Sequence, residues 1–72
     1  MDHKPELATV TTWRDEAGFG FARTDWGNTD VFVHASAFGS GPYPVKGDRI
    51  ELAVQSAPKG PRAQWASLIS PT

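Results

Sequence analysis

The chain has 72 residues, a formal net charge of −1 and no cysteine. A domain this short buries only about 60% of its unfolded surface, so it has room for one small barrel or bundle. The lack of cysteine excludes a disulfide framework and a thiolate metal site and favours a reducing compartment, by default the cytoplasm. No apolar run approaches the roughly 20 residues of a membrane span, and the first residues lack the apolar stretch of a secretion signal. The near-neutral charge argues against binding nucleic acid mainly by neutralising phosphates.

Short segments rich in Val, Thr, Phe and Trp alternate with Gly, Pro, Asp and Asn clusters along the chain, which is the all-β pattern. Residues 1–6 show no periodicity and should form a flexible N-terminus, and residues 70–72 a short C-terminal end. Between them we predict one domain, residues 7–69, with strands at about 7–14, 18–24, 30–34, 50–55 and 62–69 and one helical turn at 35–38. Because five short strands leave unpaired edges unless the sheet closes, the pattern favours a five-stranded antiparallel Greek-key barrel.

Aromatic residues alternate with glycine or valine in two of these strands, Gly18-Phe19-Gly20-Phe21 and Val31-Phe32-Val33-His34. Successive strand side chains point to opposite faces, so the two phenylalanines of the first run share one face, and Phe32 shares a face with His34. The valines are the natural inward residues, which leaves the rings exposed. The alternative, that the rings fill the core, would push the valines outward and crowd a small interior. A flat exposed aromatic surface is the usual platform for stacking unpaired bases.

These two runs resemble the ribonucleoprotein motifs of the cold-shock proteins, and Asp30 stands in its usual place before the second run. The similarity covers roughly residues 8–68. Flanking matches are Ser36-Ala37, Gly47-Asp48, Lys59-Gly60-Pro61 and Ala63. The resemblance implies a bacterial-type OB-fold barrel that binds single-stranded RNA and DNA. It also implies an RNA chaperone that modulates transcription or translation. We expect the protein to be a monomer.

The first strand departs from the family pattern. Thr11 and Thr12 stand where the family usually has a lysine and its most prominent stacking tryptophan, and Trp13 stands at a phenylalanine position. Ala17 replaces a lysine, and Ala35 replaces a phenylalanine of many members. These departures reduce both the aromatic area and the positive charge of the expected binding surface.

The residues expected to bind nucleic acid lie on the aromatic face or in loops beside it: Trp13, Phe19, Phe21, Asp30, Phe32, His34, Tyr43, Lys59 and Arg62. Alternation from Val10 favours an outward position for Trp13 with the other rings, the alternative being a position in the core. Asp30 either accepts a hydrogen bond from a base or caps the turn before its strand. By the resemblance, Lys59 and Arg62 contact a phosphate or a base edge, the alternative being solvated loop charges. A shortened loop leaves the match of Tyr43 to the family's loop phenylalanine open.

Two residues keep alternatives that the sequence leaves open. His34 either stacks on a base or makes structural hydrogen bonds. Trp26, in the polar loop between the second and third strands, either extends the aromatic surface or caps the barrel as an apolar lid.

Catalysis and metal binding are not expected. A nucleophilic site needs a positioned hydroxyl, a base and an orienting acid, and no motif supplies all of these around His34 and Ser36. His3 lies far from His34 in the sequence, without cysteine or paired acids, so we predict no metal and no cofactor.

The predicted partners are single-stranded RNA and DNA, with no membrane and no small-molecule substrate. The main alternative is a protein-interaction module that keeps the barrel but has weakened or lost its binding of nucleic acid, as the first-strand departures suggest. Its aromatic face would then receive a peptide or a partner protein.

Overall fold

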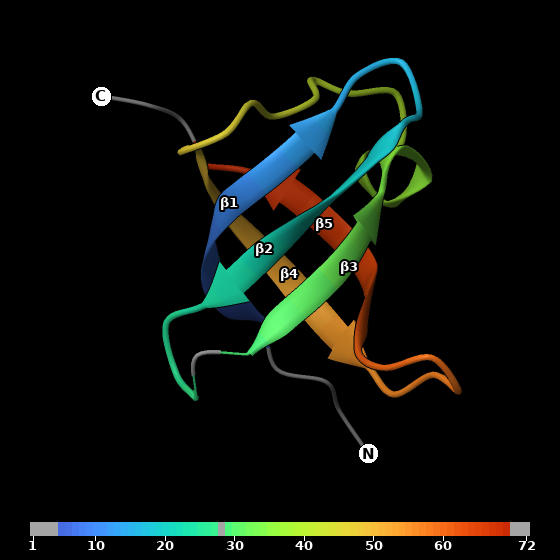
Figure 1. Cartoon of the computed structure of the whole chain (residues 1–72). Coiled ribbons are helices and arrows are strands. Elements are labelled where there is room, and N and C mark those ends of the chain that lie inside the picture. The colour runs from blue at the N-terminus through green and yellow to red at the C-terminus, as the bar shows by residue number, and fades with distance from the viewer. Residues whose placement is uncertain (1–4, 28, 70–72) are drawn as a thin grey trace.

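The computed structural model describes residues 5–27 and 29–69, which form five strands and one 3₁₀ turn (Figure 1). The elements in chain order are β1 (Glu6–Arg14), β2 (Phe19–Thr24), β3 (Asp30–His34), the 3₁₀ turn η1 (Ala35–Phe38), β4 (Arg49–Gln55) and β5 (Arg62–Leu68). Every predicted strand is present, and the ends differ from the prediction by a single residue at most. Glu6 belongs to β1, whereas most of the predicted flexible N-terminus and C-terminal end lies outside the described residues.

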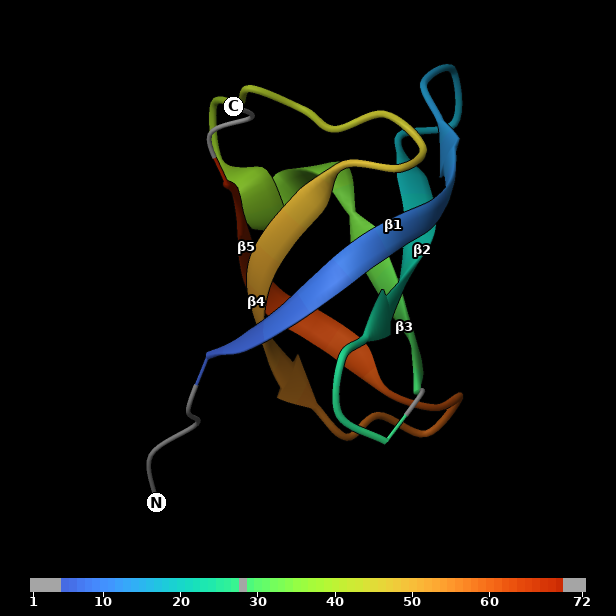
Figure 2. The same ribbon diagram turned by 90° about the vertical axis from the view of Figure 1, so that its left-hand side faces the viewer.

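The strands close into a barrel in the order β1-β2-β3-β5-β4, and β4 pairs back onto β1 (Figures 1 and 2). The predicted five-stranded barrel is therefore confirmed. The pairing is antiparallel except between β3 and β5, where Phe32 and Arg62 form a parallel pair. This parallel closure brings the start of β5 beside the middle of β3, although the two residues are far apart in the sequence.

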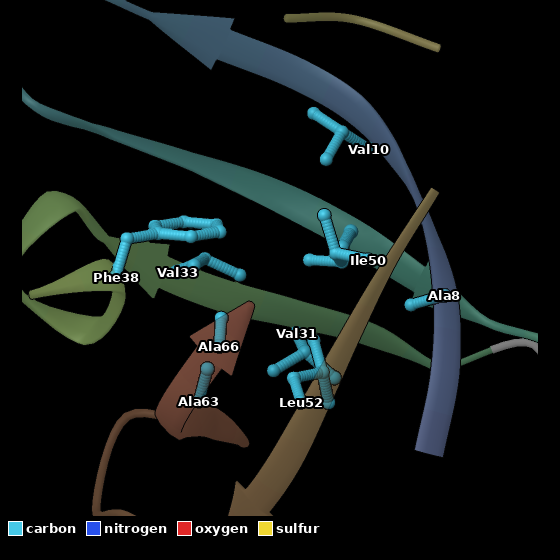
Figure 3. Close-up of a cluster of buried hydrophobic side chains, with 10 residues drawn as sticks. Ala8, Val10, Val31, Val33, Phe38, Ile50, Leu52, Ala63 and Ala66 are labelled. Atoms are coloured by element: carbon cyan, nitrogen blue, oxygen red, sulfur yellow. The ribbon is translucent and has the colours of Figure 1, made fainter. Parts of the chain in front are cut away.

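The core consists mainly of small and branched side chains that alternate inward from the strands (Figure 3). Its buried members are Ala8, Val10, Ala22, Val31, Val33, Phe38, Ile50, Leu52, Ala63 and Ala66. The two β3 valines are at most 2% exposed, so the predicted inward face of this strand is confirmed. Phe38 enters the core from η1, which lies against β5 at one end of the barrel (Figure 2). The interior is too small for the phenylalanines of β2 and β3, which remain on the outside.

A β-bulge in β1 changes the direction of the side chains that follow it. Val10 pairs with Ala22 but Thr12 pairs with Phe21, so Thr11 is an extra residue in β1. Thr11 and Thr12 are both exposed, and the alternation resumes with the opposite phase.

Trp13 consequently packs against the core instead of lying among the outer rings. Its ring meets Phe38 edge-on, with ring centroids 5.8 Å apart and an interplanar angle of 89°. Its indole N–H donates to Oδ1 of Asp15 at 2.8 Å. The prediction that Trp13 faces solvent with the other rings is wrong, because alternation counted from Val10 does not hold across a bulge.

An exposed ion pair ties β4 to the loop after β2, across β1. The Arg49 guanidinium donates from Nη1 and Nη2 to the two carboxylate oxygens of Asp25, both at 2.7 Å, and from Nη1 to Oγ1 of Thr9 at 2.9 Å. The hydrogen bond to Arg49 lowers the pKa of Asp25, and burial opposes this shift only in part. The same contact raises the pKa of Arg49. Two-point contact makes this a specific clamp on the loop.

Because of this ion pair, the stabilities of the wild type and of Asp25→Asn should differ by an amount that depends on pH. Because the pKa of Asp25 is lower in the folded state than in the unfolded state, its ion pair stabilises the fold at neutral pH. This contribution is lost as the pH falls through the folded-state pKa, below about 4. Thermal melts at neutral pH should show a higher midpoint for the wild type, and the difference between the two midpoints should shrink as the pH is lowered below about 4. A difference that is unchanged by acid would contradict the assignment.

Candidate nucleic-acid interface

The register of β2 and β3 places three pairs of residues on the outer face of the barrel. Phe19 lies opposite His34, Phe21 opposite Phe32, and Arg23 opposite Asp30. The residues between them on each strand, such as Ala22 and Val31, point into the core. We call these three outward pairs the rungs of the interface.

Three phenylalanine rings on two adjacent rungs form what we call the aromatic platform: Phe19, Phe21 and Phe32. The ring centroids of Phe19 and Phe32 are 5.5 Å apart, with an interplanar angle of 33°. Those of Phe21 and Phe32 are 5.8 Å apart in an edge-to-face arrangement at 74°. Phe21 is 39% exposed, and the other two rings are half-buried. The predicted outward direction of these rings is therefore confirmed, and their contacts hold them in fixed positions beside one another.

His34 is exposed at the end of the platform next to Phe19. Its Nδ1 accepts a hydrogen bond from the backbone N–H of Ser36 at 3.1 Å and lies 3.0 Å from Oγ of the same residue. The histidine therefore caps the start of η1, which fixes the orientation of the imidazole ring. The structural role considered for His34 is present, and it leaves the exposed ring on the same face as Phe32.

The loop between β4 and β5 forms one wall of an apolar hollow beside the platform. The hollow has a volume of about 620 Å³ and is lined by Phe21, Phe32 and residues 57–62. The guanidinium carbon of Arg62 lies 6.0 Å from the centroid of the Phe32 ring, within cation–π range. Lys59 also lines the hollow, so both predicted basic residues lie beside the aromatic rings. The volume lies in the range of about 300–1,000 Å³ found for small-ligand sites.

The third rung was not anticipated as a unit. Nε of Arg23 donates to Oδ1 of Asp30 at 3.2 Å, and both side chains are more than half exposed. Asp30 therefore lies next to a guanidinium on the platform face, a partner that neither sequence interpretation of this residue included. The sequence could have revealed this pair, because an antiparallel register that pairs Phe21 with Phe32 also pairs Arg23 with Asp30 two residues further along.

Two aromatic residues lie elsewhere. Tyr43 packs edge-on against Phe38, with centroids 6.3 Å apart, and its hydroxyl donates to the carbonyl of Gly39 at 3.4 Å. Its ring thus extends the Trp13–Phe38 contact instead of joining the platform. Trp26 is 85% exposed, so the alternative that it caps the barrel as an apolar lid is wrong.

The described residues show neither a metal-binding cluster nor a membrane-spanning helix. Within residues 5–27 and 29–69, no three His, Cys, Asp or Glu side chains gather closely enough to hold a metal ion. No helix in the same ranges is long and apolar enough to cross a membrane.

Comparisons with known proteins identify the family. The chain matches the family model of the 'Cold-shock' DNA-binding domain over residues 6–68. It is 40% identical over 58 residues to cold shock-like protein CspA of Stigmatella aurantiaca, covering 78% of this chain and 85% of that protein. It is 38% identical over 56 residues to cold shock-like protein CspI of Escherichia coli K12, covering 75% and 80% of the two chains.

A solved structure, drosophila Unr CSD456, has a similar fold, with a TM-score of 0.76 and 21% sequence identity over 97% of this chain and 29% of that one. At this identity the likeness concerns the fold alone. The family match and the bacterial relatives show that the chain belongs to the cold-shock domain family, whose members bind nucleic acids.

Proposed function

We propose that this protein binds single-stranded RNA and DNA by stacking bases on the aromatic platform. The observation that carries the proposal is the set of three contacting phenylalanine rings on the outer face of β2 and β3, beside an apolar hollow. Each stacked base contributes about 1–3 kcal/mol, so a few such contacts support micromolar or tighter binding after the costs of ordering the strand. Bases in a duplex have no free faces, so double helices should bind poorly.

We further propose that the protein acts as a monomeric RNA chaperone, without catalysis or a cofactor. Occupying unpaired bases keeps a transcript from folding on itself, and this modulates transcription or translation. Membership in a nucleic-acid-binding family supports this role. Stacking tolerates every base, so the platform by itself should bind many sequences with modest preference.

Single strands should bind saturably, at micromolar concentration or below, and a matched duplex should bind at least about tenfold more weakly because its bases are already stacked. The measurement is fluorescence anisotropy of labelled oligo(dT), a mixed RNA and the duplex. Intrinsic tryptophan emission is a poor reporter, since Trp13 packs against the core rather than on the platform.

The same titration at several salt concentrations tests how binding is achieved. If Lys59 and Arg62 supply the phosphate contacts beside the hollow, the slope of log affinity against log salt should be about −1 to −2. A slope of about −4, corresponding to six phosphates, would contradict a binding mode dominated by stacking. If no single strand binds up to high micromolar concentration, the proposal fails, and the platform becomes a surface for a protein partner.

A further inference from the structure

The rung formed by Arg23 and Asp30 continues the platform beyond its rings. Two residues along a strand correspond to about 6.6 Å, so this rung lies beside the Phe21–Phe32 rung on the same outer face. A base stacked on Phe21 or Phe32 would therefore direct one edge toward a guanidinium and a carboxylate held side by side. The pair combines a donor group and an acceptor group at the border of an aromatic surface.

Both side chains keep hydrogen-bonding groups available for a ligand. The ion pair uses Nε of Arg23 and Oδ1 of Asp30. Within residues 5–27 and 29–69, no side-chain hydrogen bond or ion pair occupies the Nη groups of Arg23 or Oδ2 of Asp30. The side chains are 53% and 55% exposed, and an exposed pair of this kind adds little to stability. The contact nevertheless holds the guanidinium fork and the carboxylate next to each other.

We propose that the Arg23–Asp30 rung is a base-reading subsite that selects guanine on the adjoining platform. The inference rests on the proposed function, because the base must first be stacked on the rings. Guanine presents two adjacent acceptors, N7 and O6, which match the arginine fork. Next to them it presents the N1–H and N2–H₂ donors, which match a carboxylate oxygen.

The other bases fit this donor and acceptor pair less completely. Cytosine offers two adjacent acceptors, N3 and O2, and one amino donor, so it should rank second. Adenine and uracil alternate donors and acceptors along the edge, so the arginine fork finds only one acceptor at a time. The expected order is guanine, then cytosine, then adenine and uracil.

The test uses oligouridylates of about seven nucleotides, within the ~4–16 nucleotides that an OB fold contacts, with G, C, A or U at the centre. Anisotropy titrations should show the guanine oligonucleotide binding at least about fivefold more tightly than the all-uridine strand. Fivefold is about the smallest discrimination between bases that a good bidentate contact provides. Replacing guanine with 7-deazaguanine removes N7 and should reduce this preference.

Arg23→Lys keeps the charge but loses the fork, so it should bring guanine to within about twofold of uridine. It should also make 7-deazaguanine and guanine equivalent, while leaving affinity for the all-uridine strand almost unchanged. Arg14→Lys is the matched control, because Arg14 is exposed at the opposite end of the β1–β2 hairpin and should keep the guanine preference. Melting temperatures verify that both variants are folded.

The outcomes separate this inference from the proposed function. Equal binding of all four strands, or a guanine preference that survives Arg23→Lys, would overturn the guanine subsite and leave the platform intact. If none of the four strands binds, the proposed function fails and the subsite fails with it.

Discussion

Replacing Phe21 and Phe32 together by alanine should weaken single-strand binding at least about 30-fold, because two stacking surfaces worth about 1–3 kcal/mol each are lost. These two rings contact each other across the central rung and border the apolar hollow. Their removal therefore eliminates the middle of the platform, whereas Phe19 remains at one end. The anisotropy titration with oligo(dT) measures the loss directly.

Two comparison variants isolate the cause of that loss. Trp65→Ala removes an aromatic ring that is 39% exposed, the same fraction as Phe21, but that lies on β5 and does not line the hollow, so binding should be unchanged. The double leucine variant at Phe21 and Phe32 keeps apolar area but has no π-face. If leucine restored full affinity, the surface would act as an apolar docking site rather than by stacking, which would favour a protein partner.

The sequence was sufficient to predict the five strands because each has a strong local signal. Glycine, proline and asparagine clusters separate the strands, and alternating apolar residues such as Val31 and Val33 define the inner face of β3. The same alternation correctly placed Phe19, Phe21 and Phe32 outside. In β2 and β3, period-two alternation alone determines which face of the barrel a side chain occupies.

Trp13 shows where this reasoning stops. Its position depends on one extra residue, Thr11, which is skipped in the register between β1 and β2. No glycine or proline marks the bulge in the sequence, so simple alternation from Val10 gave the wrong face. Tyr43 was unpredictable for a different reason, since it lies in a loop whose path depends on tertiary contacts with η1 rather than on periodicity.

The contact between Arg23 and Asp30 could have been predicted from the sequence. Each charge appeared separately beside an aromatic run, and their contact follows only when the two strands are aligned. The position of Arg62 over Phe32 required more, because it depends on the parallel closure of β3 against β5 across a long stretch of chain. Pairing within a hairpin was thus accessible from the sequence, whereas the parallel pairing that places Arg62 beside Phe32 was not.

Trp13, which the bulge turns inward, packs closely over Gly20, the glycine with the least free space around it. Gly20→Ala should therefore destabilise the fold by about 3 kcal/mol or more. An alanine Cβ would lie 2.1 Å from the carbonyl oxygen of Thr12, 2.9 Å from Cα of Trp13 and 2.7 Å from its ring. Two of these atoms belong to the backbone of a paired strand, so they cannot move aside by a change of rotamer. For 72 residues the whole stability is about 4–11 kcal/mol, so the loss removes a large part of it.

Urea unfolding followed by circular dichroism measures this effect and does not depend on Trp13 as a reporter. Gly47→Ala is the matched control: its Cβ would meet nothing within 4 Å, and its cost comes from the positive φ of 95° alone, about 1–2 kcal/mol. Combining Gly20→Ala with Trp13→Leu separates the two obstacles. If the clash with the Thr12 carbonyl causes the destabilisation, replacing the indole ring with leucine leaves the double variant as unstable as Gly20→Ala. Recovery of wild-type stability in the double variant would instead show that the indole ring, and not the path of β1, requires glycine here.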